Sequence, residues 1–215
     1  LSRTTDSYDM IVDVEEAMKS TAQEIGIAML QARRSEKDFL MRKDMKYVES
    51  VDATVARILE LAASLEALEK GAGHGDDVEK VEAIKGVIGD YHDAFTKVAA
   101  AEVKKGLDEN SGLQGVARDA AHEVELLAEE FAVEALQTQM LTLRRREKDF
   151  LMRGDEKYVT QHRKDIETFR GLLEASTLSD EQKSFLRTKI GEYGDSFAAA
   201  AKSGAKGSGL GAEYR

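Results

Sequence analysis

The chain of 215 residues contains no cysteine, no proline and no tryptophan. The absence of cysteine excludes disulfides, thiolate metal sites, iron–sulfur clusters and cysteine nucleophiles. Proline removes a helical hydrogen-bond donor and clashes with the preceding turn, so a chain of this length without proline is typical of long helices. The most frequent residues, among them alanine, glutamate, lysine and leucine, are good helix formers. We therefore predict an all-α protein.

Long apolar runs and an excess of positive charge are also missing. No stretch approaches the ~18 consecutive apolar residues that a membrane-spanning helix needs. The formal net charge is −10 and the pI is about 5.0. Because nucleic acids bind basic surfaces, this balance argues against nucleic acid as a partner.

One segment of the chain occurs twice. Residues 33–48 return at 144–159, with 13 of 16 positions identical and an offset of 111 residues. A second pair of similar segments begins at Ile88 and Ile190, with an offset of 102 residues. Such self-similarity is typical of a duplication. The difference between the offsets indicates that the second copy has a shorter internal turn.

Turn and capping residues predict six helices, two of them long and four short. Their bounds are about 4–43, 45–70, 77–105, 113–153, 155–175 and 180–203. Short connections make neighbouring helices antiparallel, so each long helix is expected to contribute to both of two stacked four-helix bundles. One predicted module comprises residues 22–132, and the other comprises residues 1–21 and 133–215.

The residues that usually carry catalysis are sparse. The four histidines lack the spacing of a helical metal site, so we expect each of them to lie on the surface or to cap a helix. No glycine-rich phosphate loop, nucleophile elbow or HExxH motif occurs. We predict that the chain is not an enzyme, and we expect no cofactor and no metal site.

Three arginines are candidates for ligand binding. Arg33 and Arg144 take equivalent places beside the apolar stripes of their helices, and Arg146 lies within its stripe. A guanidinium directed into a helical bundle needs a carboxylate partner. That partner is either an internal acid, such as Glu36 or Glu147, or the carboxylate of a small ligand.

Two tyrosines, Tyr91 and Tyr193, recur at matching places in the two copies. Each phenol can donate a hydrogen bond to a ligand or pack in the core. The predicted ligand-binding residues are therefore Arg33, Arg144, Arg146, Tyr91 and Tyr193.

The repeated Arg-Arg-x-Glu-Lys-Asp-Phe-Leu-Met-Arg segment, at 33–42 and 144–153, resembles the helical bimodular ligand-binding domains of bacterial methyl-accepting chemoreceptors. A second likeness lies in Gly106 to Leu113, followed by Gly115, Arg118, His122 and Glu123. Ser208-Gly209-Leu210 and Arg215 look like a partial second occurrence of that segment. The resemblance spans essentially the whole chain.

The resemblance implies a periplasmic sensor domain of an inner-membrane receptor, with transmembrane helices before Leu1 and after Arg215. It implies that module 22–132 is membrane-distal and that the other module is membrane-proximal. Relatives of this kind act as homodimers in chemotaxis signal transduction and bind small organic acids. The residues themselves also allow a second function. The chain could be a helical adaptor or docking module that binds a protein through Leu30, Met41 and its charged outer face.

Overall fold

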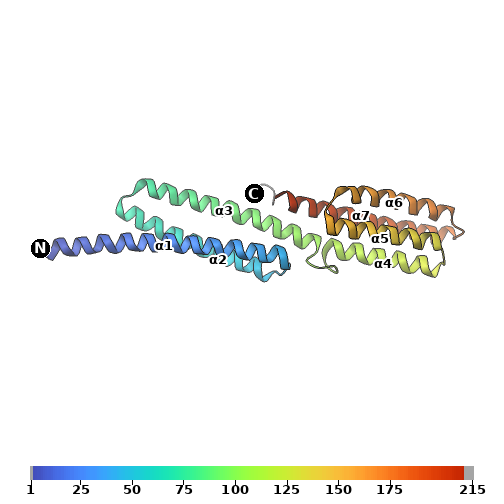
Figure 1. Ribbon diagram of the computed structural model, residues 1–215, viewed down its shortest axis with the longest axis horizontal. Helices are drawn as coiled ribbons and strands as arrows, with labels where there is room; N and C mark the ends of the chain where they lie inside the picture. Colours follow the sequence, from blue (N-terminus) through green and yellow to red (C-terminus); the bar gives the residue numbers. More distant parts are fainter. Residues whose placement is uncertain (1, 211–215) are drawn as a thin grey trace. The chain divides into compact units, whose positions relative to one another are not determined.

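The computed structural model describes the backbone of residues 2–210 and the side chains of residues 11–203, so Arg215 lies outside the described residues. Over residues 2–210 the regular secondary structure is entirely helical and consists of seven helices (Figure 1). They are α1 Ser2–Arg42, α2 Lys46–Ala72, α3 Gly75–Lys105, α4 Gly112–Glu130, α5 Glu134–Arg153, α6 Glu156–Ala175 and α7 Asp180–Leu210. None of these helices has an apolar stretch long enough to cross a bilayer. The all-α class is confirmed, and the predicted number of six helices is wrong.

The chain divides into two compact units, Leu1–Ala99 (unit 1) and Ala100–Arg215 (unit 2). Each unit is a continuous stretch of sequence. This division differs from the predicted modules, 22–132 and 1–21 with 133–215, in which the chain would pass from one module to the other within two long helices. The stacking of two four-helix bundles stays a prediction.

Unit 1 is built on the antiparallel pair α1 and α2, with α3 packed on them through side chains (Figure 1). Met18 of α1, Leu65 of α2 and Val81 of α3 belong to one buried cluster. Phe39 of α1 meets Phe95 of α3 edge-on, with ring centroids 5.9 Å apart. Apolar side chains recurring every three or four positions therefore hold the three helices together.

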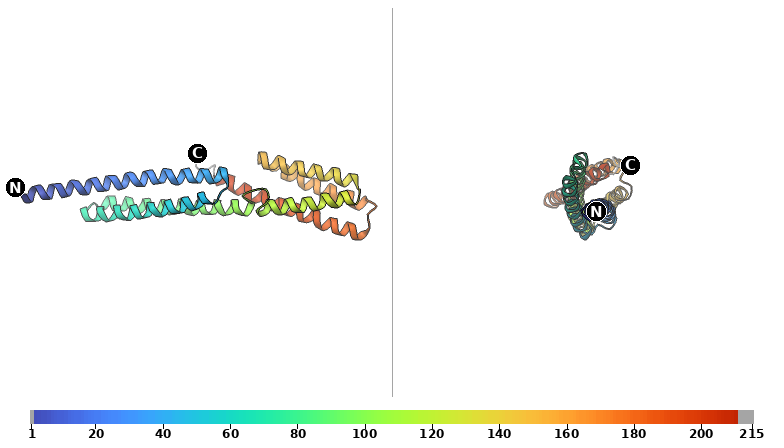
Figure 2. Two further views of the ribbon diagram at one scale, coloured as in Figure 1. Left: turned by 90° about the horizontal axis from the view of Figure 1, so that it is seen from below. Right: turned by 90° about the vertical axis from the view of Figure 1, so that its left-hand side faces the viewer.

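Unit 2 is a four-helix arrangement in which α4 and α6 each pack against both α5 and α7 (Figures 1 and 2). The four helices share one core, whose largest members are at most 1% exposed. Four alanines and a valine supply the buried apolar residues of α4, so its backbone can lie close to its neighbours. The core includes Ala121, Leu136, Met140, Phe169, Leu186 and Tyr193.

The predicted long helix 113–153 is wrong because the chain folds back after α4. Ala132 has a left-handed conformation with φ 52°. Its N–H donates to the carbonyl of Glu129 (3.0 Å), and the N–H of Val133 donates to the carbonyl of Ala128 (3.3 Å). These two bonds form a Schellman motif, which satisfies carbonyls at the end of a helix. The motif has alanine where glycine is usual.

Replacing Ala132 by glycine is expected to raise the free energy of unfolding by about 0.5–1 kcal/mol, because glycine adopts φ > 0 without the steric penalty of a Cβ. Urea denaturation of the purified chain measures this change. If the helix continued through this position, Ala132→Gly would instead lower the free energy of unfolding, because glycine inside a helix costs about 1 kcal/mol. Ala53→Gly, at an exposed position within α2, is the control and should lower the free energy of unfolding.

Side-chain caps begin α6 and α7. The carboxylate of Asp155 accepts a hydrogen bond from the N–H of Lys157 at 2.9 Å. Ser179 and Gln182 form a reciprocal capping box, with N–H to side-chain distances of 3.0 and 3.2 Å. Both caps satisfy N–H groups that have no partner inside the helix, and so fix where each helix starts.

Candidate functional site

The duplication places the same three side chains together in each unit. In unit 2, Arg144 and Glu147 come from consecutive turns of α5, and Tyr193 comes from α7. The Tyr193 hydroxyl donates to Oε2 of Glu147 at 2.9 Å, and Nη1 of Arg144 donates to the same oxygen at 2.5 Å. Tyr193 is fully buried and Glu147 is 9% exposed. We call these three residues the unit 2 triad.

The unit 1 triad consists of Arg33 and Glu36 of α1 and Tyr91 of α3. The Tyr91 hydroxyl donates to Oε2 of Glu36 at 2.8 Å, and Nη1 of Arg33 donates to that oxygen at 3.1 Å. The Arg33 guanidinium also lies over the Tyr91 ring, 5.9 Å from its centroid. The arrangement is more open than in unit 2, because the Arg33 side chain is 43% exposed.

Burial and the neighbouring glutamate raise the pKa of Tyr193 and of Tyr91 well above the usual range of a phenol. Both effects disfavour the phenolate, because burial and a nearby negative charge each penalise an anion. The two hydroxyls therefore stay protonated and act as hydrogen-bond donors to Glu147 and Glu36 over the whole physiological pH range.

Internal carboxylates pair all three predicted arginines. Arg33 pairs with Glu36, and Arg144 pairs with Glu147. Arg146 pairs with Asp165 of α6, with Nε and Oδ2 3.1 Å apart. The internal acid that the sequence left open is therefore present in each case. The predicted ligand-binding residues come together in two separate sets, Arg33 with Tyr91 and Arg144 with Tyr193, while Arg146 faces α6.

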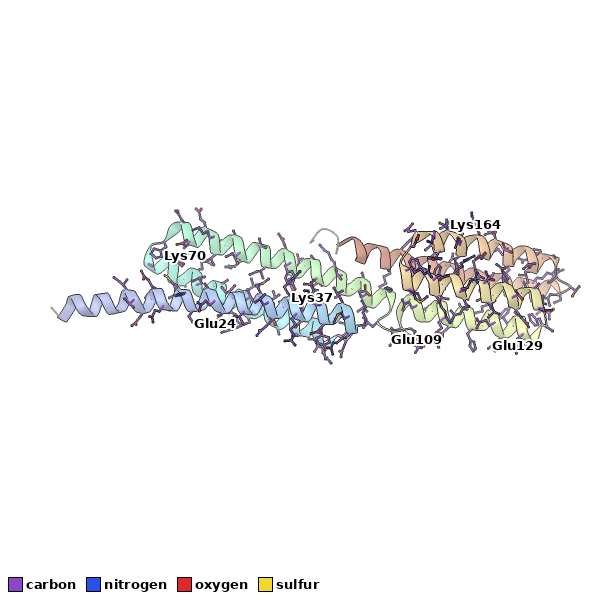
Figure 3. The ribbon with its side chains drawn as sticks, in the orientation of Figure 1. Glu24, Lys37, Lys70, Glu109, Glu129 and Lys164 are labelled. Atoms are coloured by element: carbon purple, nitrogen blue, oxygen red, sulfur yellow. The ribbon has the colours of Figure 1, made fainter. Side chains whose placement is uncertain are left out.

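A pocket of about 150 Å³ lies beside the unit 2 triad, between α4 and α5. Three of its side chains are cationic and two are anionic, so its formal charge is +1. Within the pocket, Nη1 of Arg118 pairs with Oε1 of Glu109 at 2.6 Å. Glu109 lies in the loop before α4 and is labelled in Figure 3. The lining residues are Glu109, Gln114, Arg118, Arg144, Glu147, Lys148 and Leu151.

Sequence reasoning did not select Arg118 and Lys148 as site residues. Lys148 belongs to the repeated segment and has its equivalent in Lys37 of α1. Arg118 belongs to the second segment that resembles the chemoreceptor domains. Only the fold-back of α5 onto α4 brings the two side chains into one pocket, and that reversal has no signal in the sequence.

His162 is buried in unit 2, so its predicted place on the surface or at a helix cap is wrong. It is 2% exposed, and its ring packs 4.1 Å from the Phe197 ring and 5.1 Å from the Tyr193 ring, measured between centroids. Its Nε2 atom is buried and has no hydrogen-bond partner among the described residues. Burial lowers the pKa of His162 to about 4. The imidazole is therefore a neutral core group at pH 7.

A second cavity of unit 2, about 280 Å³ in volume, lies between α6 and α7 next to His162. Two glycines of α7, Gly191 and Gly194, leave this space open because no side chain projects from them. The charged lining residues are Arg163, Glu167, Arg170 and Asp195. Their charges cancel, so this cavity is less suited to an anion than the pocket between α4 and α5.

One group of side chains in unit 1 has the composition of a metal site, although the sequence predicted none. The turn between α2 and α3 brings Glu69, His74 and Asp77 together, with one ligand atom of each within 4.8 Å of the others. The residues follow one another closely in the sequence, but their spacing is not that of a helical metal site. The turn geometry alone reveals them.

Comparisons with known proteins give no match: no protein family, no curated protein and no solved structure is similar to this chain. The resemblance to chemoreceptor domains therefore depends on the quoted sequence segments and stays a prediction.

Proposed function

We propose that the chain is the periplasmic sensor domain of a bacterial chemoreceptor and that it binds a small organic acid in the pocket between α4 and α5. The observation that carries this proposal is the grouping of Arg118, Arg144 and Lys148 around one small pocket. Guanidinium groups bind carboxylates through paired, charge-assisted hydrogen bonds. The pocket volume of about 150 Å³ suits a ligand of a few heavy atoms.

Ligand binding requires Arg118 to exchange one carboxylate for another. Its partner Glu109 is 74% exposed, so this ion pair is weak and Glu109 can move into solvent. Arg144 stays in place because Glu147 holds it, and Glu147 is in turn held by Tyr193. The triad thus orients one cation for the ligand, while the loop before α4 releases the other.

We further propose that binding changes the packing of α4 against α5 within a homodimeric receptor. A ligand shifts such an equilibrium only through its different affinity for the two states. The exchange at Arg118 supplies that difference, because it frees the loop that contains Glu109. Helices that cross the membrane outside residues 1–215 would transmit the change.

The experiment is a thermal-shift and calorimetric screen of the purified chain against mono- and dicarboxylic acids, amino acids and amines. At a concentration about 100-fold above its Kd, one carboxylate is expected to raise the Tm by about 5 °C. Arg118→Ala and Lys148→Ala are each expected to weaken its binding by about tenfold or more, because each removes a charge-assisted hydrogen bond.

Arg187→Ala is the matched control, because Arg187 forms an exposed ion pair with Glu174 away from the pocket. It should leave the affinity unchanged. Loss of binding in Arg163→Ala, with Arg118→Ala unaffected, would move the ligand to the cavity between α6 and α7. A screen in which no compound raises the Tm would contradict the proposed sensor function.

A second candidate function, docking of a protein partner, is favoured by one repeated surface feature. Leu30 and Met41 on α1 are 73% and 74% exposed. Their equivalents in the second copy, Leu141 and Met152 on α5, are also exposed. Large apolar side chains at matching exposed positions are typical of protein contacts when they cluster. A ligand screen in which no compound raises the Tm would favour this function.

A further inference from the structure

We infer that the turn between α2 and α3 is a binding site for a divalent transition-metal ion, with Glu69, His74 and Asp77 as ligands. Lys70, which is labelled in Figure 3, marks the last turn of α2 where the site begins. The inference concerns unit 1 and is independent of the proposed carboxylate pocket in unit 2.

The backbone of the turn sets the position of His74. Gly73 has φ 79°, and its N–H donates to the carbonyl of Lys70 at 3.2 Å. The N–H of His74 donates to the carbonyl of Glu69 at 3.0 Å. These bonds form a Schellman motif. In most such motifs the two residues that His74 and Glu69 represent here are apolar and contact each other. Here an imidazole meets a carboxylate instead.

The Glu69 carboxylate lies in an unfavourable place for a lone anion. Glu69 is 9% exposed and belongs to the last turn of α2, where the helix dipole is negative. Its one hydrogen-bond partner among the described residues is Nδ1 of His74, 2.7 Å from Oε2. One hydrogen bond with a side chain that is 46% exposed compensates this buried charge only in part. A bound cation would neutralise the buried charge.

Asp77, in the first turn of α3, supplies the third ligand atom. Its present partner is Nζ of Lys80 at 2.7 Å. The Lys80 side chain is 72% exposed, and such surface pairs contribute little. Lys80 can therefore turn away when a metal ion binds.

The distances allow a metal ion after small side-chain rotations. Ligand atoms about 2.1 Å from a tetrahedral zinc ion lie about 3.4 Å apart. The three ligand atoms of the turn lie within 4.8 Å of one another. His74 also lines an open cavity of about 490 Å³ between α1 and α2, which leaves room for water as a further ligand.

One imidazole and two carboxylates select the chemical class of the ion. Imidazole suits zinc, copper, iron and nickel, whereas magnesium and calcium prefer sites made of oxygen ligands. An ion at this site would connect the end of α2 to the start of α3. It would therefore stabilise the turn that joins these helices.

The test is calorimetric titration of the untagged full chain with Zn²⁺, with Mg²⁺ as a comparison. We expect one Zn²⁺ per chain, a higher Tm on binding, and reversal by EDTA. His74→Ala and Glu69→Gln are each expected to weaken binding by at least about tenfold, because each removes a metal ligand. Glu69→Gln keeps the shape of the buried side chain, and His74 is exposed, so both variants are expected to fold.

His92→Ala is the matched control. His92 also pairs with a carboxylate, Asp52, at 2.7 Å, but this pair has no third ligand atom nearby in the part of the chain that the structure describes. The affinity of the His92→Ala variant for Zn²⁺ should equal that of the wild-type chain. Equal weakening by His92→Ala, or a chain that binds no Zn²⁺, would overturn the inference. A failed carboxylate screen would not affect it.

Discussion

Replacing Glu147 by alanine is expected to lower the free energy of unfolding by about 3–5 kcal/mol. Glu147 is the acceptor for both other members of the unit 2 triad. Without it, the fully buried Tyr193 hydroxyl loses its acceptor, and the Arg144 side chain, which is 24% exposed, keeps only a longer contact of 3.5 Å with Glu125. A buried donor without an acceptor costs far more than its hydrogen bond contributes when made. Urea denaturation followed by far-UV circular dichroism measures the change.

The duplication provides the control for this prediction. Glu36→Ala removes the equivalent carboxylate from the unit 1 triad, where Arg33 is 43% exposed. Water can solvate the guanidinium there, so the expected loss is only about 1–2 kcal/mol. Burial thus sets the difference between two clusters made of the same three residue types. Equal losses in the two variants would contradict this explanation.

The second large effect concerns pH and His162. Its pKa falls from 6.5 in the unfolded chain to about 4 in the folded protein. Only the unfolded state binds a proton in this interval, so the contribution of His162 to stability is complete above pH 6.5 and is lost as the pH falls toward 4. The expected loss is about 3 kcal/mol, because one pKa unit corresponds to about 1.4 kcal/mol.

His162→Leu isolates this contribution from that of the carboxylates. Leucine cannot bind a proton, and the aromatic rings of Tyr193 and Phe197 that surround the imidazole accept an apolar side chain. We expect the variant to lose less stability than the wild type between pH 6.5 and pH 4, with the difference approaching about 3 kcal/mol. An unchanged slope in His162→Leu would show that the imidazole is not the responsible group.

Local interactions explain which parts of the site the sequence could predict. Arg33 and Glu36 stand three residues apart on one helix, as do Arg144 and Glu147, and such pairs meet whenever the helix forms. The repeat predicted Tyr91 and Tyr193 as site residues, because equivalent positions of a duplication have equivalent surroundings. The partner of Arg146 was not predictable, since Asp165 lies on α6 and meets Arg146 only through helix packing.

The sequence by itself determined the helical class, the duplication and the spacing that places Arg33 near Glu36 and Arg144 near Glu147, because helix formation and contacts three or four residues apart depend on local preferences. Tertiary structure alone decided the reversal at Ala132. There the backbone leaves the helix without glycine or proline, so that apolar side chains of α4 and α5 can share one core. The left-handed alanine costs about 1–2 kcal/mol, which the burial of one or two large apolar side chains offsets.

The same long-range packing decided three further features. It buried His162 between aromatic rings, and it brought Arg118 beside Arg144. It also left Glu69 buried at the end of α2, facing His74. A residue's burial depends on which elements cover it, and periodicity describes only the face on which the residue lies. That is why the helices could be predicted from the sequence and the pockets could not.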